Sequence, residues 1–172
     1  VLQRMTAHVH TGAPLPRELF ERMRAARAFQ SGLAMLRNCE YGLFDMRLHG
    51  GPPPATEREI LAQLDEIRRE VAVLQPPEYN RFPHAFSHIF AGGYAAGYYS
   101  YKWAEVLSAD AFGAFEEAGL DDVRRVQETG RRFRDTVLAR GGSEHPLEVF
   151  RAFRGRGPST AALLRHAGLA AA

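Results

Sequence analysis

Five apolar residues recur at steps of three and four in one segment, and this spacing constrains the fold more strongly than any other feature of the sequence. They are Ile60, Leu64, Ile67, Val71 and Leu74. Such a period places the side chains on one face of an α-helix. Thr56 and Glu59 stand three apart just before the run, which is the spacing of a capping box. Proline-rich segments at 50–54 and 75–77 bound the run, so the sequence predicts an amphipathic helix whose charged face is solvated.

The rest of the chain shows the same succession of helical segments and breaks. A long apolar-rich helix is predicted from Ala28 to about His49, with neighbours on two sides because its apolar residues cover more than one face. Breaks and caps between the later helices are predicted at Ala118–Gly119, Asp121 or Asp122, Gly141–Gly142, Pro158–Ser159 and Gly168. We find no convincing strand pattern. We therefore predict one all-α domain over residues 1–172, an irregular arrangement of six to eight helices.

Charge and composition narrow the range of partners. The formal net charge is only +2, and arginines are interspersed with carboxylates, which argues against a nucleic-acid surface. No apolar run approaches the length needed to cross a bilayer and the first residues do not resemble a signal peptide, so no membrane partner is expected. Cys39 is the single cysteine, which excludes an internal disulfide and favours a buried apolar role on its helix. These features fit a reducing, cytoplasmic setting.

The stretch from His88 to Glu105 holds four of the six tyrosines in the chain. On a continuous helix at about 100° per residue, four side chains of this stretch share one stripe: Tyr94, Tyr98, Tyr101 and Glu105. Four others gather on the opposite side, which we expect to face the core: Tyr99, Trp103, Val106 and Leu107. Packing does not require hydroxyl groups on the first stripe, so these tyrosines are candidates for ligand contact. The alternative is that aromatic residues at helical spacing simply belong to the core.

Two patterns near this stretch suggest other chemistry only weakly. His84 and His88 are four apart, but no glutamate follows His84 as in an H-E-x-x-H zinc helix, and no third ligand is evident nearby. We therefore predict no metal site in this chain. Gly92 and Gly93 lack the pattern of a phosphate loop, and they are better explained by mobility or by a close approach of the backbone to a ligand. A loop that closes over a substrate has this composition.

Several motifs together resemble one enzyme family. The segment 82–101, followed by Trp103 and Glu105, is similar to the C-terminal region of the M3 family of zinc oligopeptidases, also called the thimet oligopeptidase family. The run Leu43-Phe44-Asp45-Met46-Arg47-Leu48-His49 is similar as well. Three shorter motifs also match the family: 11–16, 140–143 and 153–156. The likeness covers nearly the whole chain, and the bacterial oligopeptidase A branch is the most similar.

The resemblance implies a zinc-dependent metalloendopeptidase of largely helical fold, with a channel that admits short peptides and excludes folded proteins. In this family the zinc is held by an H-E-x-x-H helix and a downstream glutamate, which lie before the region resembled here. Residues 1–172 would then be the C-terminal part of the catalytic domain. They would lack the zinc ligands and the general base, so zinc is expected in the full-length enzyme and not in this fragment, which would be inactive alone.

The resemblance also implies a role for each candidate site residue. His88 and Tyr94 would lie with Gly92 and Gly93 on a mobile glycine-rich loop over the bound peptide. Tyr101 would donate a hydrogen bond to the oxyanion of the tetrahedral intermediate, with help from Tyr94. Tyr98 would contact the substrate backbone, and His88 a substrate carbonyl.

A second hypothesis is a stand-alone helical module that binds peptides without catalysis. Coding sequence upstream of Val1 would separate the two hypotheses, because an H-E-x-x-H helix with a downstream glutamate decides for the enzyme. The expected partners are short peptides and the missing N-terminal part of the same enzyme. A fragment without that part would expose apolar surface, so we also expect it to self-associate.

Overall fold

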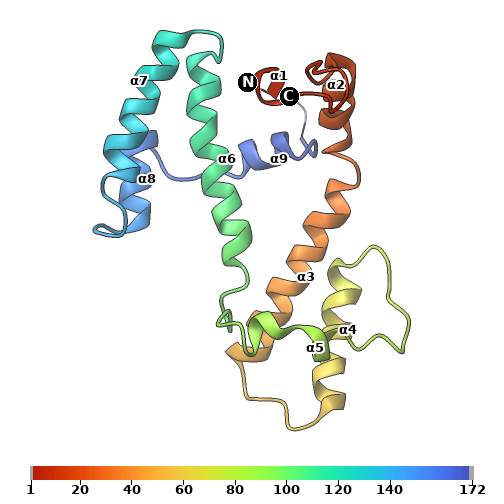
Figure 1. Cartoon of the computed structure of the whole chain (residues 1–172). Coiled ribbons are helices and arrows are strands. Elements are labelled where there is room, and N and C mark those ends of the chain that lie inside the picture. Colours follow the sequence, from red (N-terminus) through yellow and green to blue (C-terminus); the bar gives the residue numbers. More distant parts are fainter. Residues whose placement is uncertain (1, 171–172) are drawn as a thin grey trace.

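Two long helices, α3 (Ser31–Gly50) and α6 (Ser100–Ala118), organise the molecule (Figure 1). The computed structural model describes residues 2–170. Its other helices are α1 (Leu2–Met5), α2 (Arg17–Ala26), α4 (Glu57–Val71), α5 (Phe82–Ala85), α7 (Val123–Phe133), α8 (Pro146–Arg154) and α9 (Ala161–His166). A 3₁₀ turn, η1, spans Ser87–Ile89, and a π-helical segment, η2, spans Arg134–Leu138.

The all-α prediction is confirmed. Residues 2–170 contain nine α-helices and no strand. The number exceeds the predicted six to eight when α1 and α5, which are single turns of four residues, are counted as helices. None of the helices in this range is both long and apolar enough to cross a membrane.

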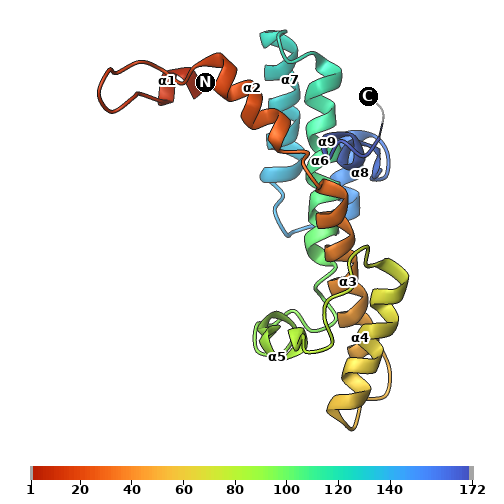
Figure 2. The ribbon, with the colours of Figure 1, turned by 90° about the vertical axis from the view of Figure 1, so that its right-hand side faces the viewer.

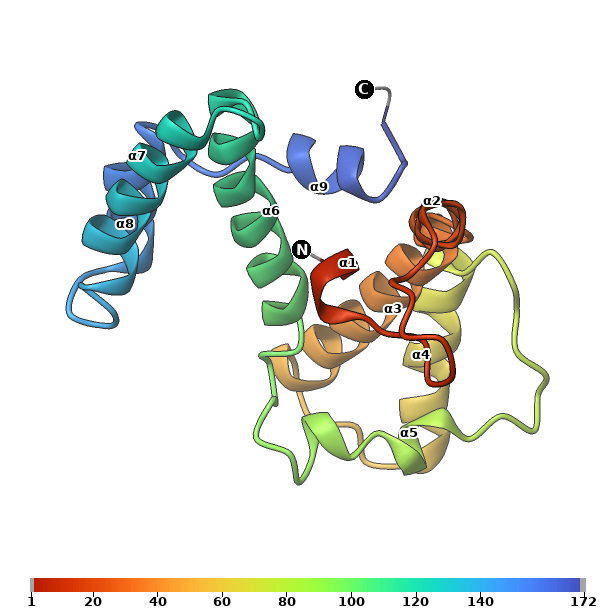
Figure 3. The same ribbon diagram turned by 45° about the horizontal axis from the view of Figure 1, so that its top comes forward.

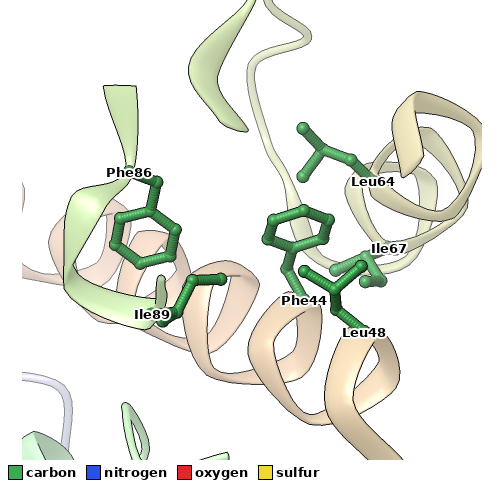
Figure 4. Close-up of a cluster of buried hydrophobic side chains, with 6 residues drawn as sticks. All are labelled: Phe44, Leu48, Leu64, Ile67, Phe86 and Ile89. Atoms are coloured by element: carbon green, nitrogen blue, oxygen red, sulfur yellow. The ribbon is translucent and has the colours of Figure 1, made fainter. Parts of the chain in front are cut away.

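The clearest hydrophobic core lies between α3, α4 and the segment from α5 to η1. Six buried side chains form it: Phe44, Leu48, Leu64, Ile67, Phe86 and Ile89. Figure 4 shows the pair from α3 facing the pair from α4, with Phe86 and Ile89 beside them. Complete burial of a Leu, Ile or Phe side chain contributes about 1.5–3 kcal/mol each. This core fixes the segment that precedes the tyrosine-rich stretch against α3.

The predicted start of α4 at the N-cap Thr56 is confirmed, and one hydrogen bond of the capping box is shifted by one residue. The Glu59 amide donates to the Thr56 hydroxyl over 3.3 Å, as in a capping box. The Glu59 carboxylate reaches back to the amide of Ala55, over 2.7 Å, instead of that of Thr56. The cap holds the first turn of the helix that carries Leu64 and Ile67 into the core.

Helix α6 packs against α7, α8 and α9. Its buried carboxylate Asp110 accepts hydrogen bonds from Arg154, Arg156 and the amide of Ser159, over 2.6–3.2 Å. Burial opposes ionisation of Asp110, but the hydrogen bonds from Arg156 and Ser159 and the positive charges outweigh it, so its pKa lies below the usual range. This network ties the loop after α8 to the middle of α6. Figure 2 shows α7, α8 and α9 gathered around the upper part of α6.

Helices α3 and α6 approach each other at one end and diverge toward the other, where α9 lies between them (Figures 1 and 3). At the wide end the Ser31 hydroxyl of α3 donates to the carbonyl of Ala167, over 2.6 Å, just after α9. At the narrow end the backbone of Tyr99 passes close to Gly42 of α3. The tyrosine-rich stretch therefore occupies the junction where the chain crosses from α3 to α6.

The predicted burial of Cys39 is wrong. Its side chain is exposed on α3. The residue after it, Glu40, is buried and pairs with Arg68 of α4 over 3.0 Å, so the side of α3 that faces α4 does not include Cys39. The apolar-rich sequence of this helix suggested burial on more sides than α4 covers.

Candidate functional site

The tyrosine-rich stretch is a bend followed by a helix. Residues 90–99 form turns, and α6 begins only at Ser100. Gly93 (φ 79°) and Ala96 (φ 53°) have left-handed backbone conformations, which a right-handed helix does not tolerate. The prediction of one continuous helix through Tyr94, Tyr98 and Tyr101 is therefore wrong for the part before Ser100.

The bend nevertheless brings the predicted side chains together. The Gly97 amide donates to the Tyr94 carbonyl over 2.8 Å, which turns the chain back on itself. The rings of Tyr94 and Tyr101 stack with centroids 5.2 Å apart, and the rings of Tyr98 and Tyr101 lie 5.1 Å apart. His88 lies 6.3 Å from Tyr94 and 6.0 Å from Tyr98 by the same measure. We call these four residues, His88, Tyr94, Tyr98 and Tyr101, the tyrosine cluster.

The cluster is anchored on one side and open on the other. Tyr98 packs against the core through Phe86 and Tyr41, with ring centroids 5.0 and 5.7 Å apart. Tyr94 and Tyr101 are 38% and 39% exposed. Stacking supports the two outer rings, and their edges remain accessible to a ligand.

Two tyrosines of the cluster are held more firmly in the neutral form than an isolated tyrosine. The neighbouring Tyr94 hydroxyl, followed by burial, raises the pKa of Tyr101. Burial, followed by the proximity of Tyr41, raises the pKa of Tyr98. A neutral phenol keeps its proton, so both groups are hydrogen-bond donors at neutral pH. Such donors can stabilise negative charge that develops on a bound carbonyl oxygen.

The predicted core face of the same stretch is only partly correct. Val106 is buried, but Tyr99 and Trp103 are 55% and 44% exposed. The core lies on the side of Tyr98 instead, because the chain enters α6 from the α5–η1 segment. Glu105, predicted to share the tyrosine stripe, forms an ion pair with Lys102 at 2.6 Å.

Glycine is required at positions 92 and 93 for two different structural reasons. A Cβ atom on Gly92 would lie 2.8 Å from the Cα and 2.9 Å from the carbonyl oxygen of His88, so the backbone packs too closely for any side chain. Gly93 has open space but a positive φ. Both residues shape the sharp turn that places His88 beside Tyr94.

The described residues do not fit a zinc ion. Among residues 2–170, no three His, Cys, Asp or Glu side chains lie close enough together to hold a metal. His84 and His88 make different contacts. Nε2 of His84 lies 3.5 Å from the carboxylate of Glu57 in α4, whereas His88 belongs to the tyrosine cluster.

One residue behind the cluster was not singled out from the sequence. Asp45 of α3 is completely buried, and its carboxylate accepts hydrogen bonds from the amides of Ala96 and Tyr98, each over 2.8 Å. His49, one turn later, contacts the same carboxylate at 2.8 Å. An acidic residue followed four positions later by histidine within an apolar-rich helix is the signal that could have revealed this pair.

Comparison with known proteins identifies the family. Residues 1–169 match Peptidase family M3. The chain belongs to this family. Oligopeptidase A of Salmonella typhimurium is 53% identical to this M3 chain over 165 residues, which are 96% of the chain and 24% of the relative.

More distant M3 relatives show the same partial coverage. The organellar oligopeptidase A of Arabidopsis thaliana is 52% identical, over 99% of the chain and 22% of the relative. Dipeptidyl carboxypeptidase of Escherichia coli is 36% identical, over 98% of the chain and 24% of the relative. The chain thus spans about a quarter of the length of the curated relatives that it matches.

Proposed function

We propose that residues 1–172 form the C-terminal part of the catalytic domain of a zinc-dependent M3 endopeptidase that hydrolyses short peptides. The observation that carries this proposal is the convergence of His88, Tyr94, Tyr98 and Tyr101 at one partly exposed bend. Membership of the family and the names of the relatives support peptide hydrolysis. The zinc is assigned to the longer enzyme because the described residues offer no ligand set. The general base is assigned to the longer enzyme as well, as the family resemblance implies.

In this proposal the cluster binds the peptide and stabilises charge. Tyr101 donates a hydrogen bond from its hydroxyl group to the oxyanion, and Tyr94, which stacks on it, assists. Tyr98 is anchored in the core and contacts the peptide backbone, while His88 contacts a substrate carbonyl. The loop that bears Tyr94 and contains Gly92 and Gly93 is proposed to move over the bound peptide, as glycine-rich loops that close over substrates do.

The function is tested by comparing cleavage of a free peptide with cleavage of the same sequence within a folded protein. The full-length enzyme should hydrolyse a quenched-fluorescent peptide and should leave the same sequence intact when it is embedded in a folded protein. Removal of zinc with a chelator should abolish the turnover. Peptide binding without hydrolysis would contradict the proposal and would favour the alternative of a helical peptide-binding module.

We place the enzyme in the cytoplasm. One Arabidopsis relative is named "Probable cytosolic oligopeptidase A", whereas the organellar relative is named for the chloroplast and mitochondrion. Fractionation of cells that express the full-length enzyme tests this assignment, and recovery of the enzyme outside the cytoplasmic fraction would contradict it.

Exposed apolar side chains near the junction of α3 and α6 support a further part of the proposal. Leu43 and Met46 of α3 are exposed, as are Tyr99 and Trp103 at the start of α6. We propose that this surface meets the N-terminal part of the same enzyme, since the chain covers only about a quarter of its relatives.

The chain alone should therefore self-associate through this surface. Its mass in light scattering should rise with concentration, because exposed apolar surface favours association. Trp103→Ser should reduce the rise, whereas Tyr79→Ser, at an exposed aromatic residue outside this surface, should not. A monomer at every concentration would count against the proposed surface.

A further inference from the structure

Asp45 is a buried charge with an unusually complete set of partners. Its side chain has no solvent exposure. One carboxylate oxygen accepts from the Ala96 amide and from His49, and the other accepts from the Tyr98 amide, all over 2.8 Å. Burial of a carboxylate costs free energy unless hydrogen bonds compensate for the lost water. Loss of any of these three contacts would therefore destabilise this part of the fold.

The donors come from the bend that carries the tyrosine cluster. Ala96 and Tyr98 lie 51 and 53 residues after Asp45, so the contact joins distant parts of the chain. Ala96 holds a left-handed backbone conformation (φ 53°), which is unfavourable for a residue with a Cβ atom. The hydrogen bond from the Ala96 amide to Asp45 stabilises this conformation.

The same contact fixes the entry to α6. The residue before this helix, Tyr99, makes no side-chain cap, and the amides of Ser100, Tyr101 and Lys102 donate to carbonyls of residues 97–99. The carboxylate of Asp45 accepts from the two amides just before the helix, those of Ala96 and Tyr98, and brings a negative charge close to the positive end of the helix. Tyr101 lies in the first turn of this helix and Tyr98 donates one of the two hydrogen bonds.

His49 completes the arrangement. Its Nδ1 faces both the Asp45 carboxylate, at 2.8 Å, and the Asp45 carbonyl, at 3.0 Å. Both neighbours are acceptors, so this nitrogen carries the proton and donates. In the segment 43–49, Phe44 and Leu48 therefore pack in the core. Asp45 binds the amides of the bend, and His49 binds Asp45.

We propose that Asp45 is a positioning residue for the peptidase reaction, which fixes Tyr98 and Tyr101 through the backbone of the bend. This inference rests on the proposed function of the tyrosine cluster. Asp45 does not touch the substrate. It holds the amides of Ala96 and Tyr98 so that the hydroxyl of Tyr101 meets the reacting carbonyl in a fixed geometry, and small displacements of such groups cost much activity.

Asp45→Asn in the full-length enzyme tests this role. An asparagine keeps the size of the side chain but presents an NH₂ group to one of the amide donors, so one hydrogen bond is lost and two donors face each other. We expect kcat to fall about tenfold to a hundredfold, with a much smaller change in KM. Hydrogen exchange at the amides of Ala96 and Tyr98 should become about tenfold faster or more.

Asp110→Asn is the matched control, because Asp110 is an equally buried carboxylate that accepts several hydrogen bonds on α6, away from the cluster. It should lower thermal stability and leave both kcat and exchange in the bend unchanged. An Asp45→Asn enzyme with normal kcat and normal exchange would overturn the proposal, as would an equal loss of kcat in both variants.

Two further outcomes remain decisive. If the unmodified full-length enzyme hydrolyses no peptide, the proposed function fails, and the exchange comparison alone decides whether Asp45 fixes the bend. If Asp45→Asn does not fold, exchange in the unmodified enzyme decides. Slow exchange at Ala96 and Tyr98 supports the role of Asp45, and exchange as fast as in an unstructured peptide overturns it.

Discussion

Tyr101→Phe in the full-length enzyme is expected to lower kcat about a hundredfold or more, which is the usual loss when one oxyanion donor is removed. The hydroxyl would act only when negative charge develops on the substrate carbonyl, so KM should change little and kcat/KM should fall in parallel with kcat. Steady-state kinetics with a quenched-fluorescent peptide measures both quantities.

The structure indicates why the substitution should leave the fold intact. Tyr101 stacks on Tyr94 and packs beside Tyr98 through its ring, which phenylalanine retains. Melting temperatures of the variant and the parent enzyme should therefore agree.

A matched control is available two residues earlier. Tyr99 is more exposed than Tyr101 and makes no ring contact with the tyrosine cluster among the contacts of residues 2–170. Tyr99→Phe should leave kcat unchanged. An unchanged kcat for Tyr101→Phe would remove Tyr101 from the oxyanion role, and an equal loss for both variants would point to a general effect of lost hydroxyl groups.

Features encoded by local sequence could be predicted well. The period of Ile60, Leu64 and Ile67 gave α4, and the spacing of Thr56 and Glu59 gave its cap. Both depend on residues within one or two turns of each other. The all-α class follows from many such local signals together.

Features that depend on distant contacts could not be predicted in this way. The helical period from Tyr94 to Tyr101 ignored Asp45, which binds two amides of the bend from more than 50 residues away. It also ignored which side of α6 the core would occupy, so Tyr99 and Trp103 were wrongly expected to be buried. A turn and not a continuous helix brings the rings of Tyr94, Tyr98 and Tyr101 together, whereas Glu105, expected on the same stripe, pairs with Lys102.

The second large effect concerns the 172-residue chain by itself. Hydrolysis by the proposed mechanism needs a metal ion and a general base. Residues 2–170 bring no three metal-ligating side chains together. Hydrogen-bond donors such as Tyr94 and Tyr101 stabilise charge but neither activate water nor accept its proton. The tyrosine cluster should therefore be unable to cleave a peptide without the rest of the enzyme.

Zinc content and peptide cleavage, measured together on the purified chain, test the central claim most directly. The full-length enzyme with the same quenched-fluorescent peptide serves as the positive control. We predict far less than one zinc ion per chain and no cleavage above buffer, even with added zinc. One tightly bound zinc ion per chain together with rapid turnover would contradict the account, and His84 and His88 would then be the first ligands to replace.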